Sequence, residues 1–177
     1  MGAQPVYIDL PVRREQITRL QPGDEVLLSG TMLAGRDQVH KRFYELLEAG
    51  KPLPVDIRGE TIFYMGPAPA PEGAVIGSCG PTTSARMDPF TPRLLAAGLR
   101  GMIGKGPRSS SVREAVRETG SIYFYAYGGC GALYAGRIVA ARPIAFPELG
   151  PEALLALTVT DFPVLVAMDC RGNVFTE

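Results

Sequence analysis

Short apolar runs that end in glycine are the feature of this sequence that most limits its fold. The chain has 21 glycines and 16 prolines among 177 residues, and the glycines do not form a low-complexity linker. They recur inside or just after apolar runs, at Gly77, Gly80, Gly101, Gly104, Gly106, Gly128, Gly129 and Gly131. Glycine at a strand end permits a tight turn or a close approach of the backbone to another group. The pattern therefore indicates strand ends where the chain turns sharply or approaches a ligand.

Strand-like and helix-like segments alternate along the chain without internal repeats. Apolar runs predict strands at 6–10, 25–31, 61–65, 74–78, 102–103, 122–126, 138–146, 157–160 and 164–168. Helical spacing and capping residues predict helices at 13–20, 36–49, late in 84–97, from a cap at 109–111 to 119, at 132–135 and at 151–155. We expect residues 1–177 to form a single α/β domain with a mixed sheet, whose strand order the pattern does not give.

Charge and hydropathy exclude several classes of protein. Eighteen basic residues balance eighteen acidic ones, so the whole surface is not suited to a polyanion such as nucleic acid. No apolar run approaches the roughly 20 residues that a membrane-spanning helix needs. Residues 1–9 lack the basic start and apolar block of a signal peptide. A cytoplasmic protein is the simplest expectation.

The cysteines and the histidine offer little for metal binding within this chain. Cys79, Cys130 and Cys170 are widely spaced and form no CxxC pair, which argues against a zinc knuckle or a disulfide framework. Cys130 is better explained as a small buried side chain than as a nucleophile. His40 is the only histidine, so a two-histidine metal site is excluded.

Arg36 begins the predicted helix 36–49, and His40 follows one turn later on the same face. An arginine at a helix N-terminus works against the helix dipole. A carboxylate ligand would explain Arg36, because a planar guanidinium can bind both carboxylate oxygens. The alternatives are an ordinary surface arginine and a polar histidine on the helix surface.

Two further segments combine glycine with hydroxyl groups or charge. In GSCGPTTSARMD, residues 77–88, backbone N–H groups and hydroxyls at a helix entrance would form an anion site, with Thr82 and Arg86 one turn apart. The alternative is that Thr82 or Thr83 only caps the helix. Lys105 lies between two glycines at a predicted strand end, without the spacing of a phosphate-binding P-loop.

Taken together, five segments resemble a known family over nearly the whole chain. They are GDEVLLSGTMLAGRDQVHKR, LPVDIRGETIFYMGPAPA, IGSCGPTTSARMDPFTPRLL, GMIGKGPRS and DFPVLVAMDCRGN. This order of motifs resembles the β region of class I fumarate hydratases and L(+)-tartrate dehydratases. GPTTSARMD together with GMIGKG is the specific part of the match. The chain resembles a separate β subunit, equivalent to the C-terminal domain of the one-chain enzymes.

The resemblance implies a fold, a cofactor and a set of site residues. The implied fold is a swivelling β/β/α domain. The implied cofactor is a 4Fe–4S cluster that three cysteines of a separate α subunit hold, with none of its ligands in this chain. Arg36, Arg86 and Lys105 would bind a C4-dicarboxylate, and Thr82 would be the catalytic residue near the carbon that loses its proton.

The expected function is the reversible dehydration of (S)-malate to fumarate by a hetero-oligomer of this chain and the α subunit. The chain alone should be inactive. One alternative is the β subunit of L(+)-tartrate dehydratase, which converts tartrate to oxaloacetate. Another is a carboxylate-binding or assembly module without catalysis.

These assignments require residues far apart in the sequence to converge. We expect Arg36, Thr82, Arg86 and Lys105 to surround one anion-sized pocket, with the three cationic groups within about 10 Å of a common point and without acidic partners. We also expect the GPTT and GKG loops to be open to solvent and bordered by apolar and aromatic residues.

Overall fold

Two long strands, β2 (Glu25–Ala34) and β7 (Leu154–Met168), hold the sheet together by pairing antiparallel with each other. The computed structural model describes residues 4–176. β3 (Thr61–Phe63), β4 (Gly101–Gly104) and β5 (Ile122–Tyr125) lie between them in the order β2-β3-β4-β5-β7. The β2–β7 pairing closes these strands into a five-stranded mixed barrel.

Two further strands extend the barrel sheet. β1 (Val6–Asp9) runs parallel to β2, and β6 (Ile138–Ala145) runs antiparallel to β7. The expected single α/β domain with a mixed sheet is thereby confirmed, and the closed barrel agrees with a swivelling β/β/α domain.

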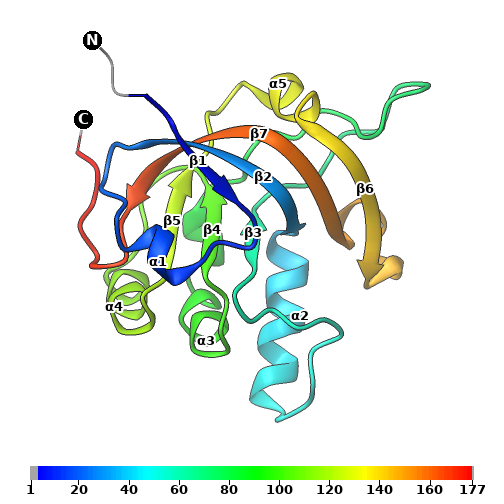
Figure 1. Cartoon of the computed structure of the whole chain (residues 1–177). Helices are drawn as coiled ribbons and strands as arrows, with labels where there is room; N and C mark the ends of the chain where they lie inside the picture. The colour runs from blue at the N-terminus through cyan, green and yellow to red at the C-terminus, as the bar shows by residue number, and fades with distance from the viewer. Residues whose placement is uncertain (1–3, 177) are drawn as a thin grey trace.

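The helices lie mainly on one side of the barrel. α2 (Asp37–Glu48), α3 (Thr91–Ala96) and α4 (Ser110–Thr119) lie below it in Figure 1, and α5 (Gly131–Ala135) lies at the opposite end. The remaining helical elements are α1 (Arg14–Ile17) and two 3-10 helices, η1 (Ser84–Met87) and η2 (Pro147–Glu152).

Alternation along the short strands separates two hydrophobic cores. Successive strand residues point to opposite faces of a sheet. Phe63 and Phe124 therefore belong to the cluster inside the barrel, where Phe63, Tyr134 and Phe162 pack with ring centroids 4.6–6.0 Å apart. Their neighbours Ile62 and Tyr123 face the helices and pack in the second cluster.

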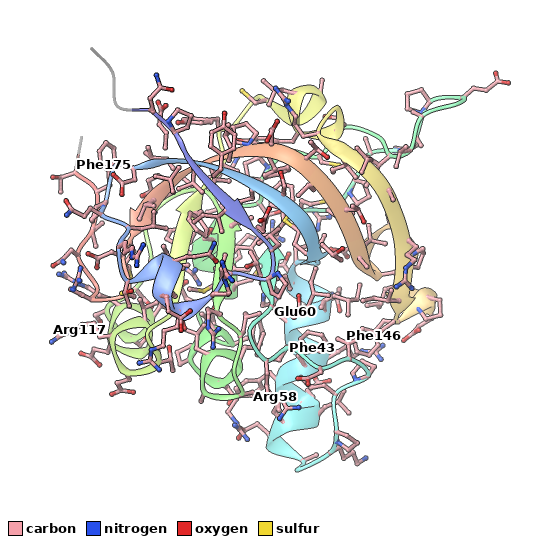
Figure 2. All side chains as sticks on the ribbon, viewed as in Figure 1. Phe43, Arg58, Glu60, Arg117, Phe146 and Phe175 are labelled. Carbon is pink, nitrogen blue, oxygen red and sulfur yellow. The ribbon has the colours of Figure 1, made fainter. Side chains whose placement is uncertain are left out.

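The second core joins α2 to the sheet and to the turn after β6. Phe43 on α2 lies 5.9 Å from Phe146, as centroid distance, and both rings are labelled in Figure 2. α4 shows why these helices begin and end where they do. The Ser109 hydroxyl accepts a hydrogen bond from the Val112 amide at its start, and Gly120 ends it with a φ of 66°.

Several sequence-based boundaries were wrong. Residues 74–78 form no strand, because this run packs as a loop against residues 68–69 and a methyl group at Gly77 would overlap the Ala68 carbonyl group. Residues 151–155 form no α-helix: η2 ends at Glu152 and β7 begins at Leu154. The strands expected at 157–160 and 164–168 are one strand, β7.

Close packing between the end of β4 and η1 generates a prediction. A methyl group at Gly104 would overlap the Ser84 hydroxyl and lie 2.8 Å from the Tyr64 ring. Gly104→Ala should therefore lower the free energy of unfolding by about 1–3 kcal/mol. Gly80→Ala is the control, because no atom lies within 4 Å of the methyl group there. Urea unfolding of both variants measures the difference, and equal stabilities would contradict the packing described.

Candidate active site

The carboxyl ends of four adjacent parallel strands lie in register at one edge of the barrel. Ala34 of β2 pairs with Phe63 of β3, Phe63 with Ile103 of β4, and Ile103 with Phe124 of β5. Arg36 follows Ala34 by two residues, and Lys105 follows Ile103 by two. Since neighbouring strands are about 4.8 Å apart, the backbones at Arg36 and Lys105 leave the sheet roughly 10 Å apart. Ligands of open parallel sheets bind at such an edge.

Thr82 is held at this edge by backbone hydrogen bonds. Its amide donates to the Tyr64 carbonyl at 2.7 Å, just after β3, and its carbonyl accepts from the Lys105 amide at 3.4 Å. The Ser84 amide then donates to the Lys105 carbonyl at 2.8 Å. Thr82 and Lys105 are therefore neighbours in space, although 22 residues of the chain separate them.

The hydroxyl groups of this segment do not cap a helix. Thr83 is the N-cap residue of η1, but its side chain accepts no capping hydrogen bond. The Thr82 hydroxyl has no hydrogen-bond partner among residues 4–176, and only 8% of the residue is exposed. The capping interpretation of these threonines was wrong, and the Thr82 hydroxyl is available for other interactions.

Arg86 projects from η1 and forms an ion pair with Asp37, the first residue of α2. Its Nε and Nη2 donate to the two carboxylate oxygens at 3.0 and 2.8 Å. The Arg86 side chain is 55% exposed and that of Asp37 is 26% exposed. This bidentate pair joins the segment that contains Thr82 to the end of β2.

Arg36 is the residue immediately before Asp37. Its Nε donates to Glu152 Oε1 at 2.7 Å, and about a third of each side chain is exposed. The guanidinium lies over Gly66, where a methyl group would approach Nε to 3.0 Å. Glycine at this position lets Arg36 lie directly on the backbone that follows β3.

Lys105 is exposed, and it forms no ion pair within the described part of the chain. A methyl group at Gly128, beyond the end of β5, would lie 4.0 Å from its ammonium nitrogen. Gly128 therefore leaves room for Lys105.

The four predicted site residues are thus connected at one edge of the barrel. Thr82 bonds to Lys105, and Arg36 adjoins Asp37, which binds Arg86. The expectation that the three cationic groups lie within about 10 Å of a common point stays a prediction. The expectation that the cations lack acidic partners was wrong for Arg36 and Arg86, which pair with Glu152 and Asp37.

Comparison with known proteins identifies the family. The family model described as "Fumarase C-terminus" matches residues 2–177. The chain belongs to this family. It is 38% identical over 164 residues to the aerobic class I fumarate hydratase of Escherichia coli strain K12, covering 92% of this chain and 30% of the relative. It is also 38% identical over 162 residues to fumarate hydratase 2 of Leishmania major, covering 90% of this chain and 28% of the relative.

A third relative is only slightly longer than this chain. The putative L(+)-tartrate dehydratase subunit beta of Methanocaldococcus jannaschii is 34% identical over 170 residues, which cover 93% of this chain and 87% of the relative. This fumarase C-terminal chain therefore spans less than a third of the two fumarate hydratases but most of the separate β subunit.

A buried ion pair between Arg108 and Asp88 lies next to the site, and no sequence pattern indicated its role. The Arg108 side chain is 0% exposed, and its Nε donates to Asp88 Oδ1 at 2.7 Å. Asp88 Oδ2 accepts from the Ser109 amide at 2.7 Å. Arg108 Nη2 donates to Thr91 Oγ1 at 2.9 Å. Asp88 ends the segment of Thr82 and Arg86, and Arg108 follows Lys105, so the pair joins both site loops.

Two tyrosines complete this network. The Arg108 guanidinium lies 5.4 Å from the Tyr64 ring centroid and 4.9 Å from that of Tyr123. The Tyr123 hydroxyl donates to the Gly106 carbonyl at 2.8 Å and lies 2.8 Å from the Ser84 hydroxyl. Burial raises the pKa of Tyr123 above its ordinary value, so this hydroxyl stays protonated and can donate.

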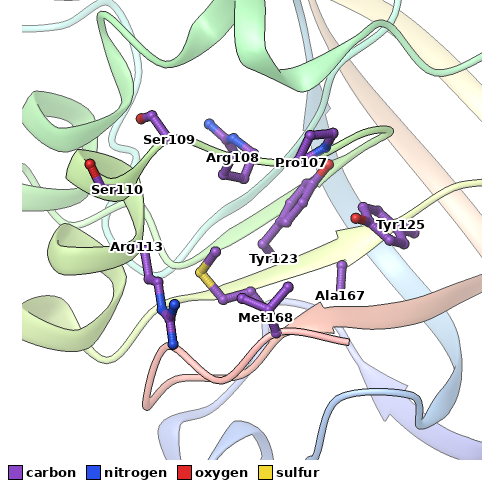
Figure 3. A pocket seen from close by; sticks show the side chains of 10 residues that line it. Pro107, Arg108, Ser109, Ser110, Arg113, Tyr123, Tyr125, Ala167 and Met168 are labelled. Atoms are coloured by element: carbon purple, nitrogen blue, oxygen red, sulfur yellow. The ribbon is translucent and has the colours of Figure 1, made fainter. Parts of the chain in front are cut away.

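The same network lines a cavity beside the N-terminus of α4. The cavity has a volume of about 250 Å³, and Arg108, Ser109, Arg113 and Tyr123 are among its lining residues (Figure 3). Its lining includes none of the four predicted site residues. The candidate site of this fumarase C-terminal chain at the strand ends is therefore distinct from this cavity.

Metal-binding side chains are scarce in the described part of the chain. Residues 4–176 contain no group of three His, Cys, Asp or Glu side chains that could hold a metal ion. The buried Cys79 thiol donates to the Gly77 carbonyl at 3.0 Å, and burial raises its pKa to about 11. Cys79, Cys130 and Cys170 belong to no such group, so these residues do not fit a cluster site. No helix among the same residues is long and apolar enough to cross a membrane.

His40 is buried rather than on the helix surface. It is 0% exposed, its Nδ1 lies 2.8 Å from the Arg36 carbonyl, and its ring meets Tyr64 edge-on at 5.0 Å. Since a carbonyl only accepts, Nδ1 carries the proton. Burial lowers the pKa of His40 from 6.5 to about 4. The neutral ring therefore stabilises the backbone at Arg36 by donating a hydrogen bond to its carbonyl.

The lowered pKa of His40 predicts a pH dependence of stability. Between pH 6.5 and 4 the unfolded chain binds a proton at this residue that the folded chain does not. The free energy of unfolding should therefore fall as the pH drops through this window, by up to roughly 3 kcal/mol from this residue. His40→Leu removes that contribution. The carboxylates contribute the same pH dependence to both proteins, so the difference between the two profiles reports His40. Urea unfolding at several pH values measures it; parallel profiles for the two proteins would contradict the assignment.

Proposed function

We propose that this chain is the β subunit of a two-subunit hydro-lyase that interconverts (S)-malate and fumarate. The observation that supports it most is that hydrogen bonds and an ion pair connect the segments of Arg36, Thr82, Arg86 and Lys105 at one edge of the barrel, in a chain of the fumarase C-terminus family. We assign dicarboxylate binding to the three cations and proton transfer to Thr82.

The cations suit the charge of the substrate and of the transition state. Malate has two carboxylates, and removal of a proton from the carbon beside one of them places further negative charge on that carboxylate. Arg36 and Arg86 can each offer paired N–H donors to carboxylate oxygens, whereas Lys105 acts as a compact positive charge. Fixed cations lower the barrier when they interact more strongly with the transition state than with the bound substrate.

Two observations support the assignment of proton transfer to Thr82. Its backbone is fixed by the Tyr64 carbonyl, and its hydroxyl has no partner among the described residues. A threonine hydroxyl is a weak base, so a second group must accept its proton. We assign that group to the partner subunit.

The iron–sulfur cluster that we infer for the complete enzyme belongs to the α subunit. When bound there, it would act as a Lewis acid that polarises the departing hydroxyl group. This chain contributes the opposite side of the site: it binds the carboxylates, orients them and holds the hydroxyl of Thr82 near the reacting carbon.

Two observations support a partner on the candidate site. The fumarate hydratases of Escherichia coli and Leishmania major have more than two thirds of their length outside the matched region. Three exposed apolar side chains also belong to segments next to the site loops, with 47–52% of each exposed. Val75 precedes the GPTT segment in the sequence, Tyr127 adjoins the glycine beside Lys105, and Leu133 lies on α5, whose first residue packs against Gly80. Apolar and aromatic side chains are typical of subunit interfaces.

A tartrate dehydratase β subunit is the second candidate. The Methanocaldococcus jannaschii relative bears that name, and the chain covers 87% of its length. Both substrates are C4-dicarboxylates, so the same three cations would bind either one. A carboxylate-binding module without catalysis is the third possibility, and it predicts that malate binds to the isolated chain.

Co-expression with the α subunit and anaerobic assay with malate, fumarate and tartrate test the proposal. The isolated chain should be inactive, and the complex should dehydrate malate faster than tartrate. Thr82→Ala should lower kcat by about 10²–10⁴-fold with little change in KM. Arg86→Ala should raise KM and lower kcat/KM, because it removes a carboxylate ligand. Thr83→Ala is the matched control and should stay within about twofold of wild type.

The outcomes separate the candidates. Turnover of tartrate alone would select the second candidate. Turnover of neither substrate would reject a hydro-lyase of this type. Near-normal kcat in Thr82→Ala would exclude it from proton transfer while leaving the dicarboxylate site intact.

A further inference from the structure

Each arginine of the candidate site is held by a carboxylate along one edge only. Asp37 engages Nε and one N–H of Nη2 of Arg86, and Glu152 engages only Nε of Arg36. A guanidinium has five N–H donors. Within the described residues, neither guanidinium group has any further hydrogen-bond partner. Donors suited to a second carboxylate therefore stay available on both groups.

Stability does not explain these pairs. All four side chains are at least a quarter exposed, and ion pairs of this kind contribute only about 0–1 kcal/mol to folding. Both pairs nevertheless join elements that meet at the site: Asp37 links α2 to η1, and Glu152 links η2 to the start of α2. A long flexible side chain fixed at its Nε edge loses less conformational entropy when it binds a ligand.

We propose that Asp37 and Glu152 are positioning residues for the dicarboxylate, a role that rests on the proposed function. Each fixes the plane of one guanidinium and leaves its remaining donors to a substrate carboxylate. Each also offsets part of the repulsion among Arg36, Arg86 and Lys105 in the empty site.

The competing possibility, that the carboxylates hinder binding, predicts the opposite change in KM. If the two carboxylates merely compete with the substrate for the arginines, neutralising them should tighten binding, because the site becomes more positive. If they position the arginines, neutralising them should weaken binding, because the guanidinium groups become disordered. The direction of the change in KM decides between the two.

The chain provides a matched control for each position. Glu48, at the other end of α2, pairs with Arg93 at 2.9 Å, so Glu48→Gln is the control for Asp37→Asn. Glu148, also on η2, pairs with Arg42 of α2 at 3.2 Å, so Glu148→Gln is the control for Glu152→Gln. Both controls remove a partly exposed ion pair of similar length from the same elements.

The experiment measures KM and kcat for the assembled enzyme with malate, and the ¹H–¹⁵N signals of the arginine Nε–H groups in the isolated chain. Asp37→Asn and Glu152→Gln should each raise KM by roughly threefold to tenfold with kcat within about twofold of wild type. The Nε–H signals of Arg86 and Arg36, respectively, should lose their protection from exchange. Both controls should leave KM and these two signals unchanged.

The failures are distinguishable. If the wild-type assembly turns over no dicarboxylate, the proposed function fails and the positioning role fails with it. If the wild type is active and KM is unchanged or lower in Asp37→Asn and Glu152→Gln, only the positioning role is overturned. A rise in KM equal to that of the controls would overturn it as well, since it would reflect loss of an ordinary surface pair.

Discussion

The buried ion pair between Arg108 and Asp88 is the interaction on which the candidate site most depends. Thr82 and Lys105 lie outside the helices and strands, and the two loops pair only through an isolated parallel bridge between Thr83 and Lys105, so propensity alone does not fix their conformations. Arg108 and Asp88 lie at the ends of these loops and bind each other at 2.7 Å with the arginine fully buried. Burying two charges costs several kcal/mol that their attraction barely offsets. We therefore interpret the pair as fixing one arrangement of the loops rather than as adding stability.

The residues around this pair explain how a small barrel presents a charged site. Tyr64 connects both sides: its ring packs against Arg108 and His40, and its carbonyl holds the Thr82 amide. The helix-side core thus supports the site loops from within. On the solvent side, Asp37 and Glu152 pair with the two arginines. Buried contacts thereby fix the backbone, while exposed pairs act only on side chains.

Much of this architecture could be predicted from the sequence, and the exceptions have physical causes. Helical spacing located α2 and α4, and apolar runs located β2 to β5, because burial imposes a period on the sequence. The prediction of a strand at 74–78 was wrong because this run forms a loop that packs on residues 68–69 and, at Ser78, against Gly131 of α5. The prediction of two separate strands near the C-terminus was wrong because β7 continues through Asp161, although the φ of this residue is 48°. Register across the barrel depends on pairings distant in the chain, which no local pattern contains.

Local patterns indicated the candidate site residues and a resemblance supplied their roles, but the residues that support them were not predicted. Arg108 and His40 look like surface residues by type, and only the tertiary fold buries them. Hydrogen exchange in Asp88→Asn tests most directly whether the buried pair holds the two loops. If the pair holds the loops, exchange should be faster at the amides of Ser84 and Lys105, which join them, and unchanged at Gly35, whose amide bonds to the Phe63 carbonyl and belongs to neither loop. Unchanged protection at Ser84 and Lys105 would contradict it.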